Sequence, residues 1–382
     1  MRFKIIKILI FLILLTPLFS YLWWQFSKEK PVNIYILDKT VSTFQRNEHL
    51  ALNWVLNQYR YTKDDLSSYQ ANTDYDGFYP LKNKQFYTQD MDSLDESQLD
   101  SLSSALDLVY YTDLYGVYEN EWYYNKNETE HSKLIYGGMT ENEYLLLEKM
   151  KNQKKLIISE FNMIASPTSS TIRHKTEQLF DIHWTGWTCR YFSLLDTTKN
   201  KELPRWVIRL YKEQNNGNWP FKKSGIVFVH ENSRIEILEK KTHLKDELPF
   251  IFTSEYGQKT YQLPAKISYP YWIDITYSGH SNQVVSTYLI NPNDEGQKLL
   301  KDAGIPLEFP AVIEHIDDYK FYYFCGDFTD NPININSSFF RGISGISFAF
   351  YNSDQLEQRK QFFWTFYRPM IKEILRKHLL TE

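Results

Sequence analysis

The first half of the chain alternates short, continuous apolar segments with amphipathic segments, and this order most constrains the fold. The apolar segments are residues 32–37, 106–111, 134–136 and 156–159. Apolar residues at helical spacing follow at about 47–58, from Thr140 onward, and at about 170–180. Strands that are apolar on both faces belong to sheets covered by helices on both sides. The pattern therefore predicts an α/β fold with a Rossmann-like or flavodoxin-like parallel sheet.

The predicted secondary structure changes from alternating strands and helices to mainly strands after residue 183, and this change marks an expected domain boundary. Short β-rich segments are predicted at 205–211, 225–230, 234–239, 249–253, 271–278 and 284–290. We expect an antiparallel β-rich insertion over 184–292, which interrupts an α/β domain formed by 32–183 and 293–382. The last part carries a predicted helix near 294–303 and a hairpin turn at 317–318. A final helix at about 354–380 is expected to kink at Pro369.

The N-terminus predicts a membrane anchor. Arg2, Lys4 and Lys7 precede an uncharged apolar run at residues 8–24. Basic residues before an apolar segment favour a cytoplasmic N-terminus. The C-terminal end of the segment lacks the Ala-x-Ala pattern at which a signal peptide is cleaved. Residues 1–27 are therefore predicted to be a transmembrane signal anchor. The expected localisation is a single-pass protein of the cell membrane with its C-terminal domain periplasmic or extracellular.

Composition limits the partners. The net charge is −4 with 42% hydrophobic residues, which indicates a folded chain without the cationic excess that nucleic acid binding needs. Cys189 and Cys325 are too few for a disulfide scaffold, although pairing between them stays open beside simple burial. The histidines show no zinc-ligand spacing, and neither a metal nor a cofactor is expected.

Acidic residues follow four of the predicted strands. The catalytic candidates are Asp38, Asp113, Glu160 and Asp327. Ligands of parallel sheets bind outside the carboxyl ends of the strands, so these side chains are expected near one crevice. They are suited to general acid and base chemistry or to holding a hard cation. The alternative is that they only cap helices and form turns.

A second group of candidates lies at the start of the β-rich region. The sequence Trp184-Thr-Gly-Trp187-Thr-Cys-Arg190-Tyr191 places aromatic rings beside a cationic donor. Trp184, Trp187, Arg190 and Tyr191 are therefore candidate ligand-binding residues for a glycan or a peptide. Packing between the α/β domain and the insertion is the alternative role.

The centre of the α/β region resembles a known family. A strand running into Gly137-Gly138, a helix opening Thr140-Glu-Asn-Glu143, a basic turn at 151–155 and a strand at 156–159 resemble class I glutamine amidotransferase-like domains. The resemblance covers 32–183 with the final strand and helix, and it implies the α/β fold. Glu160-Phe-Asn-Met163 stands where glutaminases carry their nucleophilic cysteine. Glutamine hydrolysis is therefore not expected, because no thiol is present to form the thioester.

A second resemblance competes with the first. Asp38-Lys-Thr40 after a strand, Thr112 after another, and Asp327-Phe-Thr-Asp330 after the last are similar to the motifs of haloacid-dehalogenase-type phosphatases. This implies Asp38 as nucleophile and Asp327 with Asp330 as Mg²⁺ ligands. Thr40 departs from the pattern, since most phosphatases of that family carry a second aspartate there.

Two functional hypotheses follow. The first is a membrane-anchored, extracytoplasmic binding or assembly component of the cell envelope, linked to polysaccharide. Its expected partners are the membrane through residues 8–24, and a glycan or a membrane-embedded envelope protein, with no nucleic acid. The alternative is an extracytoplasmic hydrolase that uses the strand-end carboxylates, on glycosidic bonds rather than on phosphate.

Overall fold

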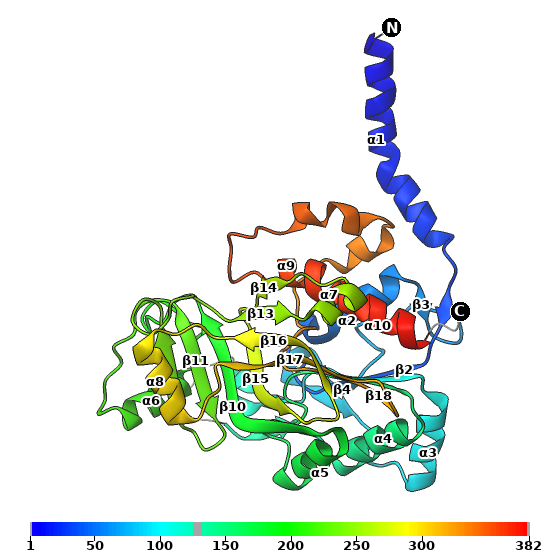
Figure 1. Ribbon diagram of the computed structural model, residues 1–382. Coiled ribbons are helices and arrows are strands. Elements are labelled where there is room, and N and C mark those ends of the chain that lie inside the picture. The colour runs from blue at the N-terminus through cyan, green and yellow to red at the C-terminus, as the bar shows by residue number, and fades with distance from the viewer. Residues whose placement is uncertain (1, 125–131, 380–382) are drawn as a thin grey trace.

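The computed structural model describes residues 2–124 and 132–379, and in the first helix it leaves out the side chains of residues 2–6, 8–10 and 13. Figure 1 shows a central sheet with helices on both sides and one helix that projects from the body. The predicted mixed α/β class is confirmed.

Within the described residues, the largest sheet has ten strands. In spatial order they are β14 (Lys266–Ser268), β13 (Phe250–Thr253), β16 (Gln283–Leu289), β17 (Glu308–His315), β18 (Lys320–Phe324), β9 (Leu156–Ser159), β6 (Leu108–Tyr111), β2 (Ile34–Asp38), β4 (Asp76–Pro80) and β5 (Phe86–Gln89). β18, β9, β6, β2 and β4 are parallel. Counted in chain order these five strands run 2-1-3-4-5, which is the flavodoxin-like arrangement.

Helices cover both faces of this sheet. On one side lie α3 (Glu96–Ala105), α4 (Glu141–Asn152) and α5 (Ser170–Phe180), and on the other lie α2 (Asn47–Gln58), α7 (Glu255–Tyr261) and α10 (Arg368–Leu379) (Figure 1). The predicted start of α4 is confirmed, because Thr140 and Glu143 form a reciprocal capping box. Much of the aromatic content lies in this core, where Trp54, Tyr110 and Tyr322 are among the largest fully buried side chains.

The predicted insertion at 184–292 does not form one separate unit. A four-stranded sheet contains β12 (Ile235–Glu239), β11 (Gly225–His230), β10 (Ile182–Phe192) and β15 (Trp272–Ser278). By contrast, β13, β14 and β16 extend the large sheet through antiparallel pairing with β17. The predicted strand at 205–211 is wrong, since α6 (Arg205–Gln214) is a helix that packs on β12.

Smaller elements complete the chain. They are β1 (Lys30–Pro31), β3 (Tyr61–Thr62), β7 (Val117–Tyr118), β8 (Leu134–Tyr136), α8 (Asp294–Ala303), the 3₁₀ helices η1 (Lys82–Lys84), η3 (Ile335–Phe339) and η4 (Ile343–Phe350), and the π-helical η2 (Asn120–Tyr124). The last predicted helix begins later than expected, with α9 (Lys360–Phe362) running through π-helical η5 (Phe363–Tyr367) into α10. This π turn directly precedes Arg368-Pro369, because proline cannot donate the normal helical hydrogen bond.

The N-terminal helix α1 (Arg2–Gln25) projects from the body in Figure 1. No helix in the described part of the chain is both long and apolar enough to cross a membrane. The transmembrane anchor predicted at residues 1–27 therefore has no support from the structure.

Candidate functional site

The strand order brings the four predicted acidic residues to one edge of the sheet. Asp38 ends β2, and Asp113, Glu160 and Asp327 follow β6, β9 and β18. The parallel strands end together here, and the chain order reverses between β2 and β6. Ligands of open α/β sheets bind at such a switch point. All four side chains are buried, so their partners decide what each of them can do.

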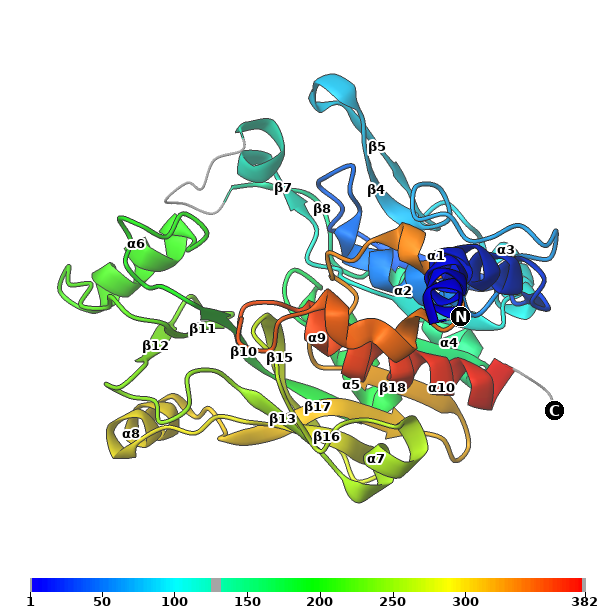
Figure 2. The same ribbon diagram turned by 90° about the horizontal axis from the view of Figure 1, so that it is seen from above.

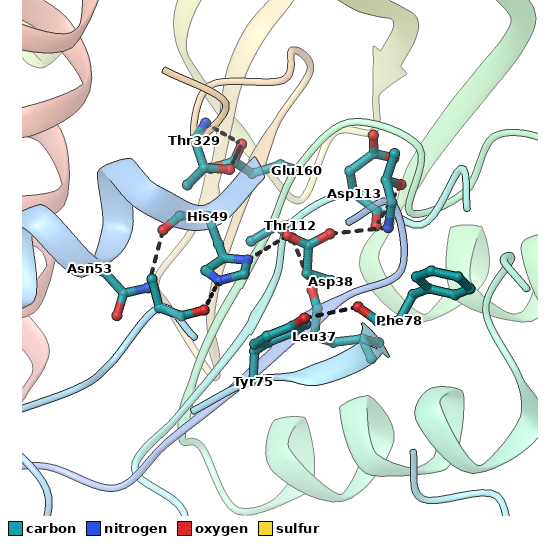
Figure 3. A network of polar contacts seen from close by, with 12 residues as sticks. Leu37, Asp38, His49, Asn53, Tyr75, Phe78, Thr112, Asp113, Glu160 and Thr329 are labelled. Carbon is teal, nitrogen blue, oxygen red and sulfur yellow. Dashed lines mark hydrogen bonds and ion pairs between the residues drawn. The ribbon is translucent and has the colours of Figure 1, made fainter. Parts of the chain in front are cut away.

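Asp38 is held by a histidine from α2. His49 Nδ1 lies 2.6 Å from Asp38 Oδ2, and His49 Nε2 lies 2.8 Å from the main-chain oxygen of Ala71 (Figure 3). A carbonyl oxygen only accepts hydrogen bonds, so Nε2 carries a proton. Asp38 Oδ1 accepts a hydrogen bond from the Thr40 amide at 3.1 Å. Both ring nitrogens of His49 are therefore occupied, and its role is to position Asp38.

Asp113 lies beside this pair on the next strand. Its Oδ1 accepts hydrogen bonds from the Tyr115 amide at 2.7 Å and from Asn162 Nδ2 at 3.1 Å. Burial raises the pKa of Asp113 to about 7, and the charge of Asp38 adds to this against the lowering effect of these donors. Asp113 therefore exchanges its proton near neutral pH, as a general acid or base must.

Glu160 has a structural role instead. Its Oε2 accepts hydrogen bonds from the amides of Phe328 and Thr329, both at 2.9 Å, and from the Thr329 hydroxyl at 3.0 Å. Its Oε1 accepts from the Tyr110 hydroxyl. The side chain is 0% exposed, and burial raises its pKa to about 8. Glu160 thus fixes the loop after β18 to the end of β9, and its use as a catalytic group is not favoured by this geometry.

Three further carboxyl groups belong with Asp38 and Asp113. Burial raises the pKa of Asp327 well above its usual range, and the charges of Asp330 and Asp113 add to the effect. Burial also raises the pKa of Glu48 in α2 well above its usual range, and the charges of Asp38 and Asp330 add to this effect. The charges of these neighbours thus connect the five carboxyl groups electrostatically. We call Asp38, Glu48, Asp113, Asp327 and Asp330 the acidic cluster.

The acidic cluster is only partly satisfied by the protein. Arg359 Nη1 lies 3.2 Å from Asp330 Oδ2. In contrast, Glu48 Oε2 and Asp330 Oδ1 are buried atoms without a hydrogen-bond partner among the described residues. No group of three or more histidine, cysteine, aspartate or glutamate side chains among the described residues is arranged to hold a metal ion. The two oxygens without a partner can accept hydrogen bonds from a ligand.

The aromatic motif on β10 does not form an exposed platform. Trp187 and Tyr191 are buried, and the Tyr191 hydroxyl donates to Glu247 at 2.9 Å. Trp184 is half-buried under the Arg173 guanidinium, 5.3 Å from the ring centre. For Trp187 and Tyr191 the expected ligand-binding role is therefore corrected, because neither ring offers a free face. The packing alternative describes them better.

Arg190 connects this motif to the acidic cluster. Its guanidinium lies 4.8 Å from the ring centre of Tyr271 and 5.5 Å from that of Trp272. Arg359 lies over the same Tyr271 ring at 3.7 Å. Burial raises the pKa of Tyr271, and the charge of Asp330 contributes. Half-buried rings and two cations thus border the acidic cluster. No sequence motif marks Tyr271 or Arg359 as site residues, because both are far in sequence from the strand-end acids that they approach.

The two cysteines take no part in this site. Cys189 and Cys325 are both free thiols and both fully buried. Burial raises the pKa of each thiol, so neither is a ready nucleophile. Residues 160–163, which stand where glutaminases carry their nucleophilic cysteine, include the Glu160 described above and no cysteine.

Comparison with known proteins gives weak structural likenesses. No protein-family model matches the chain, and no curated protein matches it. A glutamine amidotransferase from Thermotoga maritima is similar in structure, with 8% identity, a TM-score of 0.38 and coverage of 92% of this chain and 99% of that one. A putative ThuA-like protein from Parabacteroides merdae has 11% identity, a TM-score of 0.36 and coverage of 78% and 79%. One from Bacteroides uniformis has 9% identity, a TM-score of 0.33 and coverage of 89% and 93%. The weak resemblance to glutamine amidotransferase-like proteins is confirmed, and at these values it says nothing about activity.

Proposed function

We propose that the protein is a membrane-associated binding component of the cell envelope that takes a saccharide at the acidic cluster. The observation that carries the proposal is the position of the cluster at the switch point between β2 and β6. The unpartnered oxygen of Glu48 supports it further. A buried acceptor without a partner is costly, and a ligand hydroxyl removes that cost by donating to it.

The surroundings of the cluster favour a polyhydroxylated ligand. Carboxyl oxygens accept hydrogen bonds from sugar hydroxyls, and the apolar face of a sugar ring packs on aromatic rings. Tyr271 and Trp272 are half-buried rings at the border of the cluster. A phosphate ester is disfavoured because its negative charge would be repelled by every carboxyl group of the cluster that is ionised.

The membrane part of the proposal rests on the N-terminal segment. Cationic Arg2, Lys4 and Lys7 stand before the apolar residues 8–24, and α1 leaves the body with large apolar side chains uncovered, including Leu14 and Trp23. Uncovered apolar surface of this extent is typical of contact with lipid or with another protein. We propose that α1 holds the body at the cell membrane on its periplasmic or extracellular side.

The test is glycan-array binding by the full chain in detergent. Asp113→Asn removes a carboxylate from the acidic cluster, and Glu308→Gln removes an exposed one from β17 as a matched control. We expect specific saccharides to bind the wild type and the control, and to lose at least about tenfold in affinity with Asp113→Asn. Equal binding by all three proteins, or no binding by the wild type, contradicts the proposed site.

A second candidate function is glycosidic hydrolysis at the same cluster. It is favoured by the pKa of Asp113 at about 7 and by the raised pKa of Glu48, since one group can hold a proton while a neighbour accepts one. Chromogenic glycosides are the assay. A hydrolase should lose activity with Glu48→Gln and show a pH profile with a limb near 7, whereas a binding protein releases no product.

A further inference from the structure

The 3₁₀ helix η4 exposes apolar side chains next to the foot of α1. No residue of η4 is buried, and Phe348 and Ile346 are 71% and 54% exposed. The sequence carries no charge between Arg341 and Asp354. A folded chain rarely leaves such a segment facing water without a partner.

The segment that leads into η4 is held against α1 by direct contacts. The Ser20 hydroxyl donates to the main-chain oxygen of Arg341 at 2.6 Å, and Arg341 Nε donates to the Ser27 hydroxyl at 3.1 Å. The buried Trp24 ring packs edge-on against Phe339 at 4.9 Å. Both views place the segment around residue 345 beside the lower end of α1, on the face from which α1 leaves the body (Figures 1 and 2).

Basic residues surround the same place. The guanidinium of Arg60 lies 4.4 Å from the centre of the Trp24 ring. Burial lowers the pKa of Arg341, and the charge of Arg60 is a further cause. Burial also lowers the pKa of Lys30, followed by the charges of Arg341 and Lys372. These four cations lie near one another, with Glu29 paired to Arg60 and Glu373 to Lys372. Such a group favours an anionic surface.

We propose that η4 and the foot of α1 form one membrane-contacting surface, which places Ile346, Phe348 and Phe350 in the headgroup region of an anionic bilayer. The proposal rests on the membrane association proposed above. Apolar side chains at the interface with cations around them are the usual composition of such surfaces. The surface fixes how the body is oriented relative to the bilayer, because a second contact prevents the body from rotating freely about α1.

This orientation concerns the candidate site as well. The excursion that carries η4 begins after Asp330 and ends before Arg359, and these two residues form the ion pair of the acidic cluster. The membrane-contacting segment is therefore tied at both ends to the site. A ligand bound there lies at the base of a segment that touches the bilayer, as suits a saccharide attached to lipid.

The test places a fluorescent reporter on η4 in the full chain. Ala349→Cys lies on the exposed face of η4, and Lys298→Cys on α8 is the control far from α1 in Figure 1. Both native thiols are fully buried, so a polarity-sensitive dye reacts with the introduced cysteine. The protein is reconstituted with vesicles of phosphatidylcholine and phosphatidylglycerol, which are then floated on a density gradient.

We expect both labelled proteins to float, and only the dye at position 349 to shift to shorter wavelength and be quenched by lipid-borne quenchers. Phe348→Ser should weaken that response about tenfold. Flotation with a water-exposed dye at position 349 overturns the second contact and leaves anchoring by α1 intact. Absence of flotation overturns both the anchoring and this inference.

Discussion

Replacing Glu160 with Gln is expected to stabilise the protein above pH 8 and to change its stability little near pH 5. The buried Glu160 carboxyl has a pKa of about 8, against 4.5 for an ordinary glutamate. Between these values the folded state holds a proton that the unfolded state has lost. The free energy of unfolding of the wild type therefore falls as pH rises through this window. That of Glu160→Gln does not fall for this reason, because Gln does not ionise.

The magnitude follows from the pKa shift. One pKa unit corresponds to about 1.4 kcal/mol, so the wild type loses on the order of 4 kcal/mol between pH 5 and pH 8.5 relative to Glu160→Gln. With an unfolding entropy of about 2 cal/mol/K per residue, a chain of this length has about 0.8 kcal/mol/K, and the midpoints of thermal unfolding should diverge by roughly 5 °C.

The contacts of Glu160 permit this exchange. The Gln oxygen can replace Oε2 and accept from Phe328 and Thr329. Its NH₂ group can replace Oε1 and donate to the Tyr110 oxygen, whose own proton turns to the Tyr367 hydroxyl 3.0 Å away. The contacts that Glu160 makes with Phe328, Thr329 and Tyr110 are thereby kept.

Thermal unfolding of the full chain in detergent, followed by circular dichroism at pH 5 and pH 8.5, measures the effect. Glu308→Gln, which removes an exposed carboxyl group from β17, is the control. A difference between Glu160→Gln and the wild type that is the same at both pH values refutes the reasoning. So does a variant that is several degrees less stable at pH 8.5.

Three further predictions concern the surrounding residues. His49→Ala removes a hydrogen bond to the buried Asp38 and should lower the free energy of unfolding by about 2–4 kcal/mol; a loss below about 0.5 kcal/mol in urea denaturation contradicts it. Asn162 has a φ of 65°, so Asn162→Gly should be about 1 kcal/mol less destabilising than Asn162→Ala in the same assay, and the reverse order contradicts it. Glu48→Gln removes a carboxyl group whose pKa is raised by burial and by neighbouring acids, so its thermal midpoint at pH 8 should equal or exceed that of the wild type; a clear decrease refutes that account.

Local sequence signals were sufficient for the parallel core. Residues 156–159 form a strand with the predicted bounds, and helices occupy 47–58 and 170–180. Each of these segments has a single hydrophobic pattern, of strand or of helix type, and recognisable residues at its boundaries. Parallel strands all end on the same side of a sheet, so parallel pairing alone places the acidic residues that follow them at one edge. The sequence therefore predicts where Asp38 and Asp113 lie.

The predictions differ from the structure where strand and helix signals occur in the same residues, or where a capping signal stands alone in a polar segment. Residues 205–214 carry the β-formers Trp206 and Val207, but Val207, Leu210 and Tyr211 also lie at helical spacing. Packing on β12 as a helix decides the outcome. The helix α3 (Glu96–Ala105) was not predicted, although Asp95 and Gln98 form a capping box that the sequence displays.

Long-range placement could not be predicted from the sequence. Nothing near Glu160 in sequence shows that the amides after β18 bind its carboxyl group. Likewise, Arg359 and Tyr271 reach the acidic cluster only through the tertiary fold. The burial of Trp187 depends on how the second sheet packs, so exposure of an aromatic motif is not readable from its residues alone.

The central claim is that the strand-end carboxyl groups form one electrostatically coupled site. Carboxyl ¹³C NMR titration of the full chain, with Asp113 assigned by comparison with Asp113→Asn, tests it most directly. The account predicts that Asp113 titrates near pH 7 and that Asp38→Asn moves this midpoint downward, because the charge of Asp38 helps to raise the pKa of Asp113. A midpoint near pH 4 that Asp38→Asn does not change would contradict it.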